Sequence, residues 1–294
     1  MGLLTLQDLN YEAPTSIDSA VNALAAADEN ARIFAGGTDL LVQLREDRIK
    51  PSLFIDIKKI TEARTISIDQ DHIRIGAAIT GAELDEHREL KSLIPGVAEA
   101  VGLIGSAQVQ GRATIGGNLC NASPAADSVP ALIAVSALAE VAGPNGLREI
   151  SVEKMLSKPG KTTLERGEFV VTLKIPRPGQ RSADAYLRFI PRTEMDIAVV
   201  GAGASVALDR DGFCSSARLA LGAVAPTARQ VEQVSQILLG RRLDETIFQE
   251  LSEAARSVCD PIDDKRGTIE FRTHVAGVLA KRVIKTAWCR AEAM

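Results

Sequence analysis

Residues 108–127 read QVQGRATIGGNLCNASPAAD and combine two adjacent glycines with two asparagines, a threonine, a serine, a proline and an aspartate. An apolar segment, Val129 to Ala139, follows at once. Paired glycines let a backbone turn with positive φ and approach a ligand closely. Successive amide N–H groups in such a turn form a concave nest that suits phosphate. The stretch therefore predicts a phosphate-binding turn whose polar side chains can reach a ribose or a ribityl chain.

A second glycine pair lies earlier in the chain. Residues 35–40 read AGGTDL and follow the strand-like segment Arg32–Phe34. One Gly-Gly turn alone is typical of any tight turn, but two of them, each beside an apolar run, favour a pyrophosphate held between two loops. Neither stretch fits G-x-x-x-x-G-K-[ST], and neither fits G-x-G-x-x-G after the first strand. A P-loop and the usual Rossmann fingerprint are therefore excluded.

The composition is that of an ordinary globular protein. The 294 residues are 46% hydrophobic and 24% charged, and a formal net charge of −4 gives no basic footprint for nucleic acid. No apolar run approaches the roughly 20 residues that a membrane-spanning helix needs. Residues 1–5 lack the basic start of a signal peptide. We therefore expect a cytoplasmic protein with no membrane span and no nucleic-acid partner.

Metal chemistry is not expected within this chain. The four cysteines, Cys120, Cys214, Cys259 and Cys289, are far apart and form no C-x-x-C pair. The three histidines are isolated, and we find no triad or carboxylate dyad. The sequence therefore predicts no metal ligand and no catalytic residue. If the chain handles electrons, the carrier is organic or the metals lie on another subunit.

Periodicity divides the chain into three units, at residues 1–57, 58–178 and 179–294. In the first, Ser16 is a suitable N-cap for a helix. In the second, alternation at residues 65–68 and 73–76 predicts a hairpin. A capping box at residues 80–83 predicts a helix through about Leu90, and Asp127 or Ser128 is expected to cap the apolar helix that follows. Strands are expected at 32–34, 53–57, 137–141 and 169–175, and a linker at 176–180.

The third unit is expected to form an antiparallel sheet covered by helices. Its three predicted strands are residues 185–190, 197–208 and 213–223, and its three predicted helices are residues 228–239, 244–258 and 268–290. The sequence Gly201-Ala202-Gly203 has no third glycine in place and favours close strand packing.

The two glycine motifs together resemble a known family. AGGTDL and TIGGNLCNASPAAD are similar to the FAD-binding chain of the molybdenum hydroxylases, the xanthine dehydrogenase and carbon monoxide dehydrogenase family. The resemblance covers nearly the whole chain and includes FVVTLKIPRP (169–178), MDIAVVGAGASV (195–206) and EFRTHVAGVLAKRV (270–283). It implies an α+β fold: a two-lobed FAD-binding domain of the PCMH or vanillyl-alcohol-oxidase type, then a C-terminal three-stranded antiparallel sheet with helices.

The resemblance also implies the residues that contact FAD. The first motif would line the pyrophosphate and the flavin edge, and the second would bind pyrophosphate and ribityl oxygens. Asp127 would bind a sugar hydroxyl, Phe169 and Val170 would lie near the adenine or the flavin, and Arg188 would face the flavin. The motif residues are Ile33, Phe34, Ala35, Gly36, Gly37, Thr38, Asp39 and Leu40 in the first, and Thr114, Ile115, Gly116, Gly117, Asn118, Cys120, Asn121 and Ser123 in the second.

Three of these residues have simpler explanations. Asp39 and Asp127 each precede a predicted helix and could be N-caps, and Arg188 could lie on a solvated strand face. If Asp39 does lie beside a pyrophosphate, its carboxylate is expected to point away from the phosphates, because like charges repel.

The function implied by the resemblance is electron transfer. A large partner would carry molybdopterin and hydroxylate an N-heterocycle, a purine or an aldehyde, and a small partner would carry two [2Fe–2S] clusters. FAD on this chain would pass the electrons to NAD, a quinone or O₂, within a dimer of heterotrimers. Thr38-Asp39 stands where carbon monoxide dehydrogenases commonly have His-Ser. The chain also lacks the cysteine-rich insertion that would indicate an extra [4Fe–4S] cluster.

Two other functions stay open from the sequence. A non-redox nucleotide- or phosphate-binding module needs the same glycine turns but no partner that delivers electrons. A self-contained FAD oxidoreductase needs its own substrate pocket with a proton donor near flavin N5, and the sequence indicates none.

Overall fold

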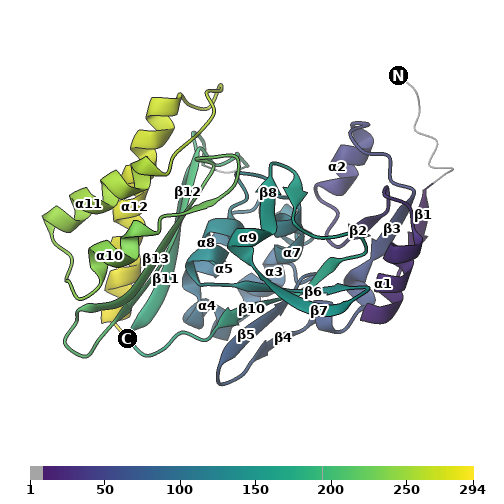
Figure 1. Cartoon of the computed structure of the whole chain (residues 1–294), viewed down its shortest axis with the longest axis horizontal. Helices are drawn as coiled ribbons and strands as arrows, with labels where there is room; N and C mark the ends of the chain where they lie inside the picture. Colours follow the sequence, from purple (N-terminus) through teal and green to yellow (C-terminus); the bar gives the residue numbers. More distant parts are fainter. Residues whose placement is uncertain (1–8, 194) are drawn as a thin grey trace.

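The structure is a computed structural model that describes residues 9–193 and 195–294. Residues 1–5, on which the prediction of no signal peptide depends, lie outside the described residues. Three larger sheets follow one another along the long axis in chain order, with the N-terminal sheet at one end and the C-terminal sheet at the other (Figure 1). Within the described residues, no helix is both long and apolar enough to cross a membrane.

The N-terminal sheet is small and parallel. Its strand order is β1 (Asn10–Glu12), β3 (Leu53–Asp56) and β2 (Arg32–Phe34). Helix α1 (Ile17–Ala26) begins as predicted, because the Ser16 hydroxyl accepts the amide N–H of Ser19. The loop after β2 leads into the short helix α2 (Leu40–Arg45). The first glycine motif therefore lies at the carboxyl end of a parallel strand, directly before a helix.

The central sheet is antiparallel and has five strands. Its order is β4 (Ile66–Ile68), β5 (His72–Gly76), β10 (Phe169–Pro176), β6 (Leu138–Gly143) and β7 (Gly146–Ser151). The predicted hairpin of β4 and β5 is confirmed. Strand β7 was not predicted, because most of it is exposed and it lacks an apolar alternation. After it come α9 (Val152–Met155) and a small hairpin of β8 (Leu156–Lys158) and β9 (Lys161–Thr162).

The helices beside this sheet are short. The capping box of Thr80 and Glu83 is confirmed, but the single helix predicted through Leu90 is wrong. The helix breaks at His87, whose backbone is extended and whose Nδ1 accepts the amide N–H of Leu90. The short 3-10 segments are η2 (Ile57–Lys59) and η3 (Glu62–Arg64), and the helices are α3 (Gly81–Glu86), α4 (Arg88–Leu93), α5 (Pro95–Val101), α6 (Ala107–Gln110), α7 (Ile115–Cys120) and α8 (Ser128–Ala134).

The C-terminal sheet has four strands rather than the three predicted. Its order is β11 (Ser182–Phe189), β12 (Val200–Leu208), β13 (Cys214–Gly222) and β14 (Arg229–Gln230). Strand β14 occupies the start of a predicted helix, because residues 229–230 pair with β13. Helices α10 (Gln233–Leu238), α11 (Glu245–Ser257) and α12 (Ile269–Glu292) cover the sheet on the side away from the rest of the molecule (Figure 1).

The central and C-terminal units pack closely on each other through α8. A Cβ atom on Gly203 would come within 2.6 Å of the backbone of Pro130, so strand β12 can approach this helix only because the residue is glycine. All seven residues of α8 are buried. The predicted packing role of the Gly201–Gly203 segment is confirmed at Gly203. The segment that follows the second glycine motif is thus held between the two units.

Candidate functional site

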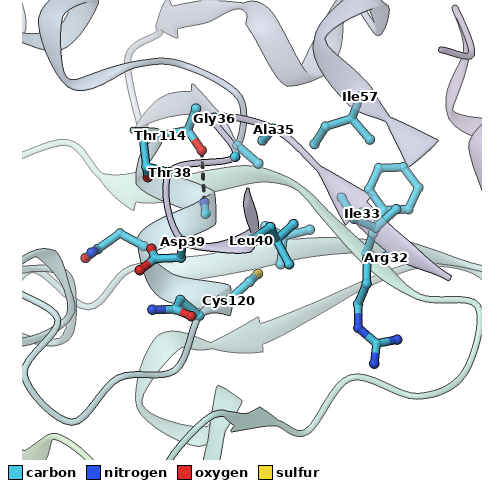
Figure 2. A pocket seen from close by; sticks show the side chains of 18 of the residues that line it. Arg32, Ile33, Ala35, Gly36, Thr38, Asp39, Leu40, Ile57, Thr114 and Cys120 are labelled. Atoms are coloured by element: carbon cyan, nitrogen blue, oxygen red, sulfur yellow. Dashed lines mark hydrogen bonds between the residues drawn. The ribbon is translucent and has the colours of Figure 1, made fainter. Parts of the chain in front are cut away.

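A cavity of about 410 Å³ lies between the first glycine motif, helix α7 and the β8–β9 hairpin (Figure 2). A volume of this size is ordinary for a small-molecule site. The cavity wall brings together both glycine motifs, which are separated by about 80 residues in the sequence. Fifteen of the predicted site residues line it: Ile33, Ala35, Gly36, Gly37, Thr38, Asp39, Leu40, Thr114, Gly116, Gly117, Asn118, Cys120, Asn121, Phe169 and Val170.

The first motif has free amide groups at the wall of this cavity. Among the described residues, no hydrogen bond uses the amide N–H of Gly36, Gly37, Thr38 or Asp39. Gly37 has a φ of +76°, a conformation that side chains disfavour. Four successive free N–H groups beside a cavity form the kind of nest that binds an anion.

The second motif is built differently from the prediction. Gly116 and Gly117 lie inside α7 and are not among the glycines of positive φ. Their amides are already used. That of Gly116 donates to the carbonyl oxygen of Ala77, and that of Gly117 donates to the Thr114 hydroxyl, the bond drawn as a dashed line in Figure 2. The expected turn of positive φ at this pair is therefore wrong, and it is the first motif that offers the nest.

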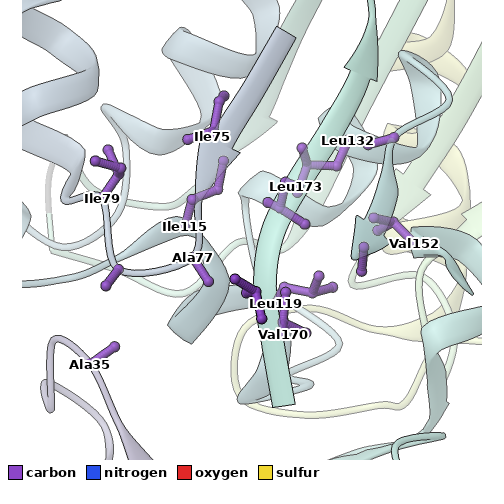
Figure 3. Packing of buried hydrophobic residues seen from close by; sticks show 14 of the residues in the cluster. Ala35, Ile75, Ala77, Ile79, Ile115, Leu119, Leu132, Val152, Val170 and Leu173 are labelled. Carbon is purple, nitrogen blue, oxygen red and sulfur yellow. The ribbon is translucent and has the colours of Figure 1, made fainter. Parts of the chain in front are cut away.

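Gly116 is required by packing. A Cβ atom there would come within 2.5 Å of the Cβ of Ala77 and 2.6 Å of its carbonyl oxygen. Ile115 and Leu119 of the same helix point into the hydrophobic core with Ala77 and Val170 (Figure 3). Helix α7 is thus fixed against the central sheet and presents its opposite side, with Gly117, Asn118 and Asn121, to the cavity.

Asp39 lies on the cavity wall, and no cation of the described residues pairs with its carboxyl group. It precedes α2 but its side chain makes no capping hydrogen bond, so the N-cap explanation is wrong. Burial raises the pKa of its carboxyl group above the usual value. Nearby, the Gln43 amide donates to the Asn121 side chain at 3.2 Å and joins α2 to the end of α7.

Asp127 and Arg188 form a buried ion pair outside the cavity lining. The Arg188 guanidinium is 2.8 Å from Asp127, and the two side chains are 6% and 9% exposed. The Tyr186 hydroxyl donates to the other Asp127 oxygen at 2.7 Å. Burial raises the pKa of Asp127 to about 6, although Arg188 and Tyr186 both favour its ionised form. Asp127 makes no capping hydrogen bond, so the N-cap explanation of Asp127 is wrong. Arg188 is buried, so its explanation as a residue of a solvated strand face is also wrong.

Three other predicted residues also lie away from the cavity wall. Phe34 packs beneath Gly37, where a Cβ atom would come within 2.5 Å of its ring. Ile115 is fully buried in the core. The Ser123 hydroxyl accepts the amide N–H of Ala125. These residues shape the loops that bear the lining residues.

Ten lining residues were not predicted. Some lie beside predicted ones and could have been included by proximity, but those of the β8–β9 hairpin and the start of β10 carried no motif. They are Arg32, Gln43, Ile57, Ala77, Ile104, Ala113, Gly160, Thr162, Leu164 and Glu168.

A second hollow, of about 790 Å³, lies over the central sheet and is larger. Among its lining side chains Arg74 pairs with Glu140 at 3.6 Å. Glu149 and Arg148 pair with Lys174 and Glu168, which lie outside the lining, at 2.7 and 2.6 Å. Neither glycine motif contributes a described residue to its lining. The smaller cavity is therefore the better candidate for a binding site.

Comparison with known families and proteins covers nearly the whole chain. The family described as the FAD binding domain in molybdopterin dehydrogenase matches residues 7–178, and the CO dehydrogenase flavoprotein C-terminal domain matches residues 185–287. The carbon monoxide dehydrogenase medium chain of Hydrogenophaga pseudoflava is 34% identical over 95% of this chain and 97% of its own length.

Two further proteins are similar over the same extent. The xanthine dehydrogenase FAD-binding subunit of Escherichia coli O157:H7 is 31% identical over 95% of each chain. A chain of the reconstituted CO dehydrogenase from Oligotropha carboxidovorans superposes with a TM-score of 0.92, at 29% identity over 96% of this chain and 98% of that one. The expected two-part fold, an FAD-binding PCMH-type domain followed by a sheet domain, is confirmed.

Proposed function

Because the chain belongs to the FAD-binding family of the molybdopterin dehydrogenases, we propose that it holds FAD in the cavity between its glycine motifs and transfers electrons as a subunit of a molybdenum hydroxylase. The observation that carries this proposal is the set of four free amides of residues 36–39 beside that cavity. The chain is a subunit of an oxidoreductase of the xanthine and CO dehydrogenase family.

The first motif is suited to the pyrophosphate. The amide groups of Gly36, Gly37, Thr38 and Asp39 would donate to phosphate oxygens, and charge assistance strengthens such bonds. The raised pKa of Asp39 lowers the cost of placing its carboxyl group near an anion, because the group is more easily protonated there.

The second motif and the neighbouring strand would hold the rest of the molecule. Thr114, Asn118 and Asn121 provide polar side chains for the ribityl and ribose oxygens, and Cys120 adds apolar surface. Phe169 and Val170, at the start of β10, line the same wall. FAD supplies the redox chemistry, since it can accept electrons singly and release them in pairs.

Asp127 and Arg188 are proposed to lie at the flavin end. Asp127 follows, by a few residues, the helix α7 that lines the cavity, and the ion pair joins this segment to β11. A guanidinium near the flavin would favour its reduced form. Asp127 neutralises much of that charge, so the effect on the potential is smaller than that of an unpaired arginine.

The partners follow from the family. We propose a large partner with molybdopterin and a small partner with two [2Fe–2S] clusters, assembled as a dimer of heterotrimers. Electrons would enter from the small partner and leave to NAD, a quinone or O₂, while the large partner hydroxylates an N-heterocycle, a purine or an aldehyde. All four cysteines are free thiols, which fits the reducing cytoplasm.

The test uses the assembled complex with and without a functional cavity. A Gly36→Val chain, whose new side chain would collide with the backbone of Arg112, is incorporated into the complex. Substrate should still reduce the iron–sulfur clusters of the variant complex, but turnover with the external acceptor should fall by at least about a hundredfold (~2.7 kcal/mol). Equal turnover by wild-type and variant complexes, with FAD lost from the variant, would contradict the electron-transfer role.

A further inference from the structure

A side chain that does not line the cavity donates a hydrogen bond to the first glycine motif. Lys58, in η2, donates from Nζ to the carbonyl oxygen of Ala35 at 2.8 Å. The same ammonium group is 2.7 Å from Asp56 Oδ2 and lies 4.4 Å from the centre of the Phe34 ring. The Lys58 side chain thus contacts both residues that precede the glycine pair.

The carboxylate partner of this lysine is itself fixed. Asp56, whose side chain is 7% exposed, accepts the Tyr11 hydroxyl at 2.5 Å and the amide N–H of Lys58 at 3.0 Å. Burial opposes its ionisation, but the hydrogen bonds from Lys58 and Tyr11 outweigh burial and hold the pKa of Asp56 below its usual value. The ammonium group therefore has a charged, well-anchored counterpart on β3.

The geometry of the peptide links this lysine to the free amides. The peptide between Ala35 and Gly36 is trans, so its carbonyl oxygen and its N–H point in opposite directions. A donor that fixes the Ala35 carbonyl therefore also fixes the direction of the Gly36 N–H, the first of the four free amides. Hydrogen bonding to a carbonyl polarises the peptide and makes its N–H a stronger donor.

The Phe34 ring is a second point at which Lys58 contacts the same loop. It packs directly beneath Gly37, which has positive φ, and Lys58 lies against the same ring. The ammonium thus supports the loop at two points.

We propose that Lys58 is a positioning residue for the pyrophosphate of the cofactor: it orients the amides of residues 36–39 without touching the ligand. This inference rests on the proposed function. Loss of the ammonium group leaves the Ala35 carbonyl without its donor and the Asp56 carboxylate close to the anion site without its counterion.

The test compares ligands with and without phosphates on the full chain. FAD, ADP and riboflavin are titrated into apo-protein of the wild type and of K58M, K58R and K59M, with thermal unfolding as a check of folding. Lys59 is the matched control, since it follows Lys58 in η2, is exposed, and makes no hydrogen bond or ion pair with the described residues. K58Q, which can donate only a neutral hydrogen bond, replaces K58M if that variant does not fold.

The proposal predicts that K58M weakens FAD and ADP binding about tenfold, which is about 1.4 kcal/mol, and changes riboflavin binding by less than about twofold. K58R should stay within about threefold of the wild type because it keeps a charged donor, and K59M should match the wild type. Unchanged FAD and ADP affinity in K58M, or an equal loss for riboflavin, would overturn the proposal.

A double variant separates positioning from charge repulsion. D56N/K58M removes the carboxylate that K58M leaves without a counterion, and the proposal predicts that most of the tenfold loss persists. Full recovery of FAD and ADP binding in the double variant would show that repulsion by Asp56 caused the loss and would refute positioning. Failure of the wild-type chain to bind FAD at all would count against the proposed function, a result distinct from either of these.

Discussion

At the scale of single residues, Gly36 lies so close to Arg112 that a Cβ atom would come within 2.0 Å of its carbonyl oxygen. Gly37 needs its positive φ, and Gly116 allows α7 to pack against Ala77. At Gly117 a Cβ atom would meet only the Thr114 hydroxyl, at 2.8 Å, within a helix. The glycine pairs could be recognised from the sequence, but the close packing at Gly36 and Gly116 could not, because Arg112 and Ala77 are distant from them in the chain.

Alanine substitution in the first and in the second glycine pair should therefore have different effects on FAD content and stability. Gly36→Ala should lower FAD content below about a tenth of the wild type and cost on the order of 1–3 kcal/mol of stability, because backbone atoms cannot move aside cheaply. Gly117→Ala should retain most of the FAD, because a hydroxyl can rotate and alanine favours a helix. Flavin absorbance per chain and denaturant unfolding measure both effects. Equal FAD loss in the two variants would contradict this assignment.

The Asp127–Arg188 pair is also a feature that the sequence could not reveal, since its members are 61 residues apart and lie in different units. Arg188→Met should lower the free energy of unfolding at pH 8 by about 3–5 kcal/mol, because it leaves a buried carboxylate without a counterion. D127N/R188M should recover more than half of that loss. Urea unfolding of the two variants measures this difference, and equal stabilities would mean that the charge of Asp127 is not the cause.

At the scale of elements, the junction of α5 with β11 is a close contact between the central and C-terminal units. A Cβ atom on Gly96 would come within 2.6 Å of the backbone of Ala185. Asp184 of β11 accepts the amide N–H of Val97 at 3.0 Å, and its other oxygen has no partner among the described residues. Arg290 of α12 pairs with Glu99 of α5. This junction therefore contains a buried carboxyl group next to an ion pair and close backbone contacts.

Asp184 should make stability depend on pH. Burial raises its pKa to about 7, and Glu99 adds to the rise, although the amides of Gly96 and Val97 and the charge of Arg290 oppose it. The folded chain thus binds more protons here than the unfolded chain between pH ~4 and ~7. The contribution of Asp184 to the free energy of unfolding is therefore greatest below that window and falls as pH rises through it.

The variant Asp184→Asn removes this titration. The shift from 3.8 to about 7 corresponds to at most ~4 kcal/mol over the whole titration. About two pH units of it lie between pH 5 and pH 8, so D184N should gain stability relative to the wild type by up to ~3 kcal/mol over that range. Denaturant unfolding at both pH values gives the difference. A difference between the two proteins that does not change with pH would contradict the assignment.

Local signals at this scale predicted some elements well and others poorly. The capping box at Thr80 and the hairpin of β4 and β5 depend on neighbouring residues and were predicted correctly. The strand β14 depends on a tertiary contact, since residues 229–230 add to the edge of β13. The break at His87 depends on a histidine that caps α4, and histidine is not one of the usual N-cap residues. Periodicity in the sequence carries no information about either.

At the scale of the whole molecule, the sequence predicted an α+β chain with two glycine motifs at one site, and the cavity joins both motifs. It did not predict which motif carries the free amides, because that depends on the hydrogen bonds that α7 makes to residues 77–79. None of the described residues of the C-terminal unit lines the cavity. The unit nevertheless fixes the segment after α7 through Tyr186, Arg188 and the contact of Gly203 with Pro130.

Whether this chain holds FAD can be decided from the cofactor content of the full chain. The purified chain is examined by visible absorption and then denatured, and the released cofactor is identified by chromatography. We predict flavin absorption bands and one FAD per chain, or uptake of one FAD when it is added. A colourless chain that takes up no FAD, even when co-expressed with its partner subunits, would contradict the account.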